Sequence, residues 1–255
     1  MVDAPSQLTT AEAANVAAPL LQEQYLKYLY NNTLNVAENK QAELICNGAN
    51  CYGLSVILCE QLKKAGLAAK VVPCKKLIKI VPHDKMNHFV VFVDCCDGYL
   101  VCETSASTPQ PIQYIFPSVG PSPEACGYVA TFGFEEGMEC IQLSRRNKKQ
   151  EMELRCNCYH KLELTETIID QILEYVNGFP IRIVSKRRRN GTPHALLIFD
   201  TVKGTLTYCS GNYKKELSVD EDVEHDEVYR NAFELDSAQW DELLRRFQSI
   251  GNVQM

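Results

Sequence analysis

The sequence of 255 residues lacks any run of about 18 consecutive apolar residues, which is the length that a membrane-spanning helix needs. Its start also lacks the positively charged and then apolar pattern of a secretory leader. We therefore expect neither a membrane partner nor secretion, and the expected location is cytoplasmic. The chain has no excess of basic residues either, because its net charge is −6, so nucleic acid is not an expected partner.

Cysteine is abundant, with twelve in the chain, but the cysteines are not spaced like a disulfide framework. Most of them alternate with Val, Leu, Ile or Phe, as at Cys59, Cys74, Cys102 and Cys140. In that pattern a free thiol packs as a small apolar side chain. We therefore expect reduced cysteines in a cytosolic protein.

One group of cysteines raises the possibility of a zinc site. Cys156, Cys158 and His160 would share one face of a strand, because side chains alternate between the two faces. Three neighbours on one strand do not supply a tetrahedral ligand set, and the only complement that the sequence suggests is Cys95-Cys96. We expect core thiols beside a surface histidine, and no bound metal.

The spacing of apolar residues changes twice along the chain and predicts three domains. Residues 1–68 have helical spacing, residues 69–164 alternate as strands do, and residues 165–255 contain both patterns. The predicted fold class is α+β, with a helical N-terminal bundle, a β-barrel-like middle domain and a C-terminal α/β lid. The middle part also contains a segment, residues 108–123, whose five prolines predict a loop that cannot be a central strand.

Individual elements follow from these patterns and from the residues that begin or end helices and turns. The predicted helices are residues 11–30, 51–65, 165–176 and 237–247, and the acidic residues 220–227 are predicted as a solvated loop. The predicted strands are residues 70–72, 77–81, 89–93, 99–102, 127–134, 139–143, 152–162, 181–186, 195–199 and 205–209.

Three residues on three different predicted elements have the chemistry of a nucleophilic triad. Cys51 opens a helix, whose N-terminal end stabilises a thiolate. His88 opens one strand, where it can carry the proton, and Glu103 ends the next strand, where it can fix the imidazole tautomer. Asp94 and Asp97 are rival acids, but Asp97 fits a hairpin turn and Asp94 lies on the same strand as His88.

A helix-borne cysteine, a strand histidine and a strand acid in this order resemble the transglutaminase-like cysteine enzymes, which have a papain-like catalytic core and include the arylamine N-acetyltransferases. Residues 103–107, Glu-Thr-Ser-Ala-Ser, with Pro109 and Pro111 after them, are similar to the Asp-Val-Gly-Phe-Gly segment of the acetyltransferases and its trailing prolines. The chain departs from the family pattern at residues 47–51, where Asn-Gly-Ala-Asn-Cys replaces the family's Arg-Gly-Gly-x-Cys. It also has glutamate as the acid in place of aspartate.

The resemblance implies an acyltransferase that moves an acetyl or other acyl group from a coenzyme A thioester to a small-molecule amine. The acyl group would rest on Cys51 between the two half-reactions of a ping-pong cycle. We assign donor binding to Ser105 and Ser107 and, within the basic run 186–189, to Arg188, whose guanidinium suits a phosphate of coenzyme A. Without such a contact, the basic run is a solvated turn.

Other functions remain open at this point. A cyclase of the same fold would act on an acyl chain that a carrier protein holds, and the carrier would then be a partner. A transglutaminase-like amidase or protease uses the same triad. A cysteine-rich binding module would use none of this chemistry.

Overall fold

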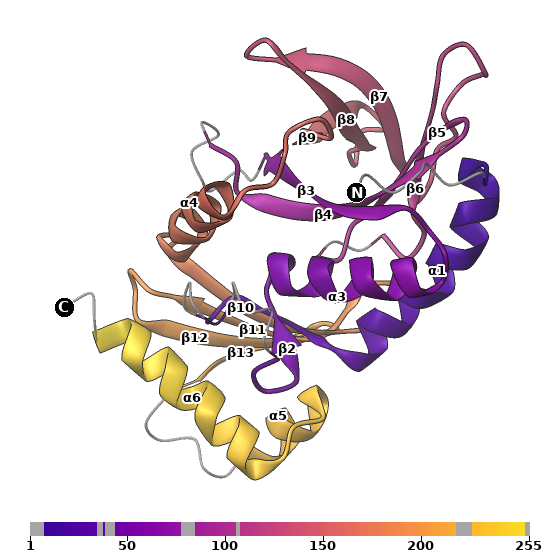
Figure 1. The fold of residues 1–255 in the computed structure, drawn as a ribbon. Coiled ribbons are helices and arrows are strands. Elements are labelled where there is room, and N and C mark those ends of the chain that lie inside the picture. Colours follow the sequence, from indigo (N-terminus) through magenta and orange to yellow (C-terminus); the bar gives the residue numbers. More distant parts are fainter. Residues whose placement is uncertain are drawn as a thin grey trace.

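The computed structural model describes residues 8–34, 38, 44–77, 85–105, 108–217 and 226–252. These residues form five helices and two β-sheets, so the predicted α+β class is confirmed (Figure 1). The helices are α1 (Thr10–Lys27), α3 (Cys51–Lys64), α4 (Glu166–Asn177), α5 (Asp226–Phe233) and α6 (Ser237–Asn252). None of them is long and apolar enough to cross a membrane, within the ranges described.

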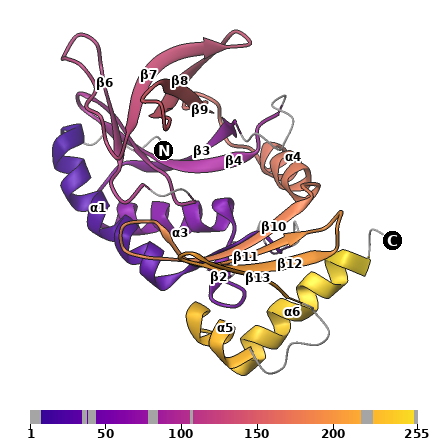
Figure 2. The same cartoon turned by 180° about the vertical axis from the view of Figure 1, so that it is seen from behind.

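The larger sheet has seven strands in the order β6-β5-β4-β3-β9-β8-β7 and curls until it nearly closes (Figure 2). Its inner face is apolar, with Phe92, Ile141 and Leu143 among the residues that fill it. The predicted alternation over residues 69–164 therefore gives a barrel-like sheet with a packed interior. The strands are β3 (Ala69–Lys76), β4 (His88–Cys95), β5 (Gly98–Cys102), β6 (Ile112–Ile115), β7 (Tyr128–Glu135), β8 (Met138–Arg146) and β9 (Met152–Cys158).

Strand β6 corrects the prediction that residues 108–123 form a loop throughout. Residues Ile112–Ile115 pair antiparallel with β5. A strand is possible here because β6 lies at the edge of the sheet and contains none of the five prolines, although Pro111 directly precedes it. The segment is not a central strand, as its prolines require.

The smaller sheet has six strands in the order β13-β12-β11-β10-β1-β2. It combines two strands from the N-terminal part of the chain with four from the C-terminal part. Strand β1 pairs with β10 and with β2, although the sequence predicts helix up to residue 30 and a helical N-terminal part. Gly48 permits this close pairing, because a Cβ there would lie 2.9 Å from atoms of Leu29. The strands are β1 (Leu29–Asn31), β2 (Gly48–Ala49), β10 (Ile181–Arg187), β11 (Pro193–Asp200), β12 (Thr205–Ser210) and β13 (Tyr213–Leu217).

Helices cover both sheets and separate them. Helices α1 and α3 pack on the outer face of the barrel-like sheet, and α3 lies between the two sheets in both views (Figures 1 and 2). Helices α5 and α6 pack on the smaller sheet through Phe233, Trp240 and Phe247, and Trp240 anchors the last helix in this core.

Two other predictions need correction or lie outside the described residues. Residues Asp226 and Glu227, which were expected in the solvated loop, begin α5, and residues 220–225 are not described. The predicted strand 77–81 lies outside the described residues except for Leu77, which is in no strand.

Candidate active site

Cys51 is the first residue of α3, and the residue before it determines where that helix begins. The side-chain oxygen of Asn50 accepts a hydrogen bond from the backbone N–H of Gly53 at 3.0 Å, which is a typical N-terminal cap. The Cys51 thiol therefore stands at the positive end of the helix dipole, where a thiolate is favoured. Its side chain is buried, with 2% exposed.

His88 and Glu103 meet because they lie at neighbouring ends of paired strands. His88 begins β4, and Glu103 directly follows β5, the strand paired with β4. The Nε2 atom of His88 lies 2.9 Å from each carboxylate oxygen of Glu103. The other ring nitrogen, Nδ1, is then left for Cys51, which lines the same cavity as His88.

The charges of this pair depend on each other. Burial opposes a charged imidazole, but the Glu103 carboxylate and the Cys51 sulfur raise the pKa of His88 to about 9. Burial also opposes ionisation of Glu103, yet His88 and Lys76 hold the pKa of its carboxyl well below its usual range. At neutral pH the pair is an imidazolium beside a carboxylate.

Lys76 and Asn87 belong to the site, although the sequence analysis did not identify them. Lys76 donates to a carboxylate oxygen of Glu103 at 3.2 Å and to the hydroxyl of Ser105 at 3.1 Å. The Asn87 side chain bonds both the N–H and the carbonyl of Lys76, at 2.8 and 2.9 Å, and so ties the end of β3 to the start of β4. A sequence signal existed, because Lys76 is in phase with the inward-facing Val72 and Cys74 of β3.

The three residues assigned to donor binding lie in different surroundings. The Ser105 hydroxyl lies 3.1 Å from His88 Nε2 and donates to Glu103 at 2.9 Å, so Ser105 contacts both His88 and Glu103. Arg188 is exposed at the tip of the β10–β11 hairpin and does not line the cavity at Cys51. Ser107 lies outside the described residues.

The basic run 186–189 is only partly the solvated turn that the sequence predicts. Lys186 and Arg187 are buried, because Lys186 donates to the Leu26 carbonyl at 2.8 Å and Arg187 donates to the carbonyls of Thr104 and Ser105. Arg187 therefore holds the segment that follows Glu103 through two backbone carbonyls.

The rival acids are engaged elsewhere. Asp94 pairs with Lys70 at 3.1 Å, and Asp97 accepts a hydrogen bond from the backbone N–H of Thr10 at 2.7 Å, at the start of α1. Among the acidic residues the sequence offered for the triad, only Glu103 lies against His88.

A cavity of about 110 Å³ opens onto Cys51 and His88. Its polar lining comes from the ends of β1, β3 and β4, and its apolar lining comes from the end of α4 and from β10. The lining residues are Tyr30, Asn32, Cys51, Lys76, Asn87, His88, Ser105, Val176, Phe179, Pro180, Ile181 and Ile183.

The cysteines near the end of β9 differ from the sequence expectation. His160 is not a surface residue, because only 6% of it is exposed and its ring stacks on Phe92. The cysteine whose sulfur lies close to those of Cys156 and Cys158 is Cys74 of β3, and not one of the Cys95-Cys96 pair.

Comparison with known proteins identifies the fold through solved structures. No protein-family model and no curated protein matches the chain. Solved structures do match, beginning with the arylamine N-acetyltransferase from Mycobacterium abscessus, at a TM-score of 0.62 and 16% identity over 92% of this chain and 88% of that chain. The arylamine N-acetyltransferase of Mycobacterium marinum in complex with CoA matches at 0.63 and 10% identity over 93% of each chain. The enzyme from Salmonella typhimurium matches at 0.61 and 10% identity over 96% of this chain and 94% of that chain. The chain therefore has the fold of the arylamine N-acetyltransferases.

Proposed function

We propose that this protein is an acyltransferase that moves an acetyl group from acetyl-CoA to a small-molecule amine, with Cys51, His88 and Glu103 as its catalytic triad. The observation that carries this proposal is a thiol at a helix N-terminus that shares a cavity with an imidazole bonded to a buried carboxylate. The match to a solved arylamine N-acetyltransferase in complex with CoA supports a CoA thioester as the donor.

In the first half-reaction the Cys51 thiolate attacks the thioester carbonyl of the donor. The tetrahedral intermediate collapses with loss of the coenzyme A sulfur, which takes the proton from Nδ1 of the His88 imidazolium. The acetyl group is then bonded to Cys51 as a new thioester, and His88 is neutral. Because one thioester replaces another, this step is nearly balanced in free energy.

In the second half-reaction the amine nitrogen attacks the acetyl carbon on Cys51. The neutral His88 takes the proton that the amine loses, and the Cys51 sulfur leaves as a thiolate. Glu103 keeps the imidazole in one tautomer and stabilises its charged form, which is the state that begins the next cycle. Lys76 and Ser105 orient Glu103 through their hydrogen bonds to it.

The size of the cavity favours a short acyl group. Its volume is about 110 Å³. An acetyl group fits that space, whereas a long carrier-bound acyl chain needs the surrounding side chains to move.

The test of this function is the mass of the protein after incubation with acetyl-CoA alone. We expect one added acetyl group, located by peptide mapping on the peptide that contains Cys51, and lost again when an arylamine is added. Cys59→Ala is the matched control, because Cys59 is a buried thiol on the same helix and its removal should leave the acetyl-enzyme unchanged. Absence of an acetyl-enzyme, or acetylation at another cysteine, would contradict the proposal.

Arg188 allows a test of donor binding. If its exposed guanidinium contacts a coenzyme A phosphate, Arg188→Ala should raise the apparent constant for acetyl-CoA about fivefold, which corresponds to about 1 kcal/mol. The second half-reaction should be unaffected, since the amine has no phosphate. Arg189→Ala, which removes the same charge from the adjacent exposed position, is the control; an equal effect of both variants would indicate only general attraction of the anion.

A further inference from the structure

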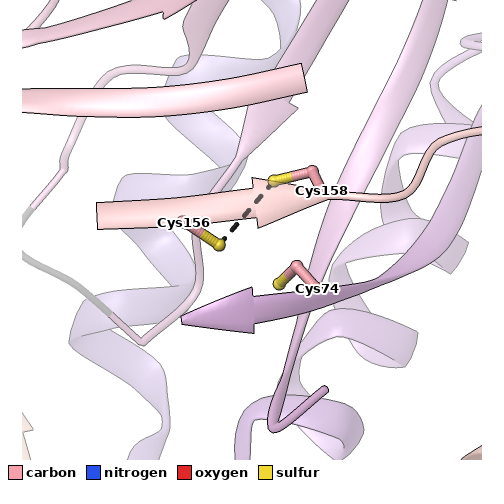
Figure 3. A group of neighbouring side chains, drawn as sticks. All are labelled: Cys74, Cys156 and Cys158. Atoms are coloured by element: carbon pink, nitrogen blue, oxygen red, sulfur yellow. Dashed lines mark hydrogen bonds between the residues drawn. The ribbon is translucent and has the colours of Figure 1, made fainter. Parts of the chain in front are cut away.

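Three cysteine thiols converge inside the barrel-like sheet (Figure 3). Cys74 lies on β3, and Cys156 and Cys158 lie on β9, where Cys74 pairs directly with Cys158. Two residues that face each other across paired strands have their side chains on the same face of the sheet. The same holds for alternate residues along one strand. The strand register therefore brings the three sulfurs together from positions more than 80 residues apart in sequence.

The three thiols form a compact and buried group. The sulfur atoms all lie within 4.8 Å of one another, and those of Cys156 and Cys158 are 3.8 Å apart. Cys74 and Cys158 have no exposed surface, and Cys156 has 4%. All three are free thiols within the apolar core of the barrel.

These separations match those of sulfurs that share one metal ion. An ion about 2.3 Å from each sulfur requires sulfur–sulfur distances of about 3.8 Å in a tetrahedral arrangement and about 4.0 Å in a planar trigonal one. One pair already has this separation, and the third sulfur is at most 4.8 Å from the others. A shift of about 1 Å or less, within the reach of a cysteine rotation, completes the set.

We propose that Cys74, Cys156 and Cys158 bind a single Cu(I) ion through three thiolates. Soft thiolate ligands favour Cu(I), whereas zinc prefers four ligands in structural sites. No fourth His, Cys, Asp or Glu atom joins the three sulfurs among the residues the structure describes. On binding, each thiol loses its proton to solvent and three sulfur–copper bonds form, while copper arrives and remains as Cu(I), so no electron is transferred.

This site is distinct from the proposed triad but lies on the same face of the sheet. Cys74 pairs in register with His88 as well as with Cys158, and Lys76, which bonds Glu103, lies opposite Cys156. Lys76 thereby supplies positive charge beside the negatively charged three-thiolate complex.

The site is tested by Cu(I) titration of the full chain carrying Cys51→Ala, which removes the thiol of the proposed active site from the measurement. With bicinchoninate as a coloured competitor and under a reducing, oxygen-free atmosphere, we expect one Cu(I) per chain. Adding Cys156→Ala should weaken the binding at least tenfold. Adding Cys102→Ala instead, which removes a buried thiol on the other face of the sheet, should leave the binding unchanged.

A second measurement does not depend on how well the Cys156→Ala chain folds. X-ray absorption at the copper edge of the loaded Cys51→Ala chain should give three sulfur neighbours at about 2.3 Å and no nitrogen neighbour. The proposal is overturned if copper binds with nitrogen ligands, if Cys102→Ala and Cys156→Ala weaken binding equally, or if the chain binds Zn²⁺ but no Cu(I).

Discussion

Cys51→Ala is expected to abolish acetyl transfer, with a fall in turnover of about 10⁴-fold or more. Alanine has no nucleophile, so the acetyl-enzyme cannot form. His88→Ala should cause a loss of the same order, because in the proposed mechanism the imidazole stabilises the thiolate, protonates the leaving sulfur and accepts the amine proton. The measurement is release of free coenzyme A from acetyl-CoA in the presence of an arylamine, followed with a thiol reagent.

The double variant sharpens this prediction. Since Cys51 and His88 act as one unit in the proposed mechanism, Cys51→Ala combined with His88→Ala should be no slower than either single variant. Cys59→Ala should retain turnover, and circular dichroism should confirm that each variant is folded. A Cys51→Ala chain that still turns over at a substantial fraction of the original rate would remove this cysteine from the mechanism.

Glu103→Gln is expected to lower turnover about 10²- to 10⁴-fold and to lower the pKa of His88 from about 9 toward its ordinary value. The amide keeps the size of the side chain, but it cannot balance the charge of the imidazolium. Burial of His88, which opposes its charge, then acts without compensation from the carboxylate. An NMR titration of the His88 ring measures the shift without requiring any activity.

The sign of the accompanying pH dependence follows from the raised pKa. In the original chain, the charged His88 contributes stability that is fully present below the ordinary histidine pKa and is lost as the pH rises through about 9. In Glu103→Gln this contribution should be small, so the unfolding midpoints of the two chains should differ most between about pH 4.5 and pH 6.5. The difference should shrink below that range, where the Glu103 carboxylate becomes protonated, and again as the pH rises through about 9.

Asp94→Asn is the matched control for the choice of acid. Asp94 pairs with the half-exposed Lys70 and lies away from His88, so its replacement should change neither turnover nor the titration of His88. Loss of turnover in Asp94→Asn together with normal turnover in Glu103→Gln would contradict the assignment of Glu103.

Local sequence patterns determined much of this protein by themselves. The apolar spacing after Cys51 gave a helix that the structure begins at that same residue, because the Asn50 cap is a local interaction over three residues. The alternation of β-branched and aromatic residues gave β4 and β5, and the Asp97-Gly98 turn joined them as a hairpin. His88 and Glu103 then had to lie near the same end of the two paired strands, since the register of that hairpin sets both positions.

Only the tertiary structure decided which distant residues meet. Strands β1 and β2 are too short to have a periodic pattern, and they form because β10 and the close approach at Gly48 provide partners. Arg187 looked like part of a solvated turn, but it is buried and donates to the carbonyls of Thr104 and Ser105, more than 80 residues earlier in the chain. The cluster of three thiols at Cys74, Cys156 and Cys158 depends on the pairing of β3 with β9. Such long-range pairing depends on the packing of the whole sheet, which no local pattern specifies.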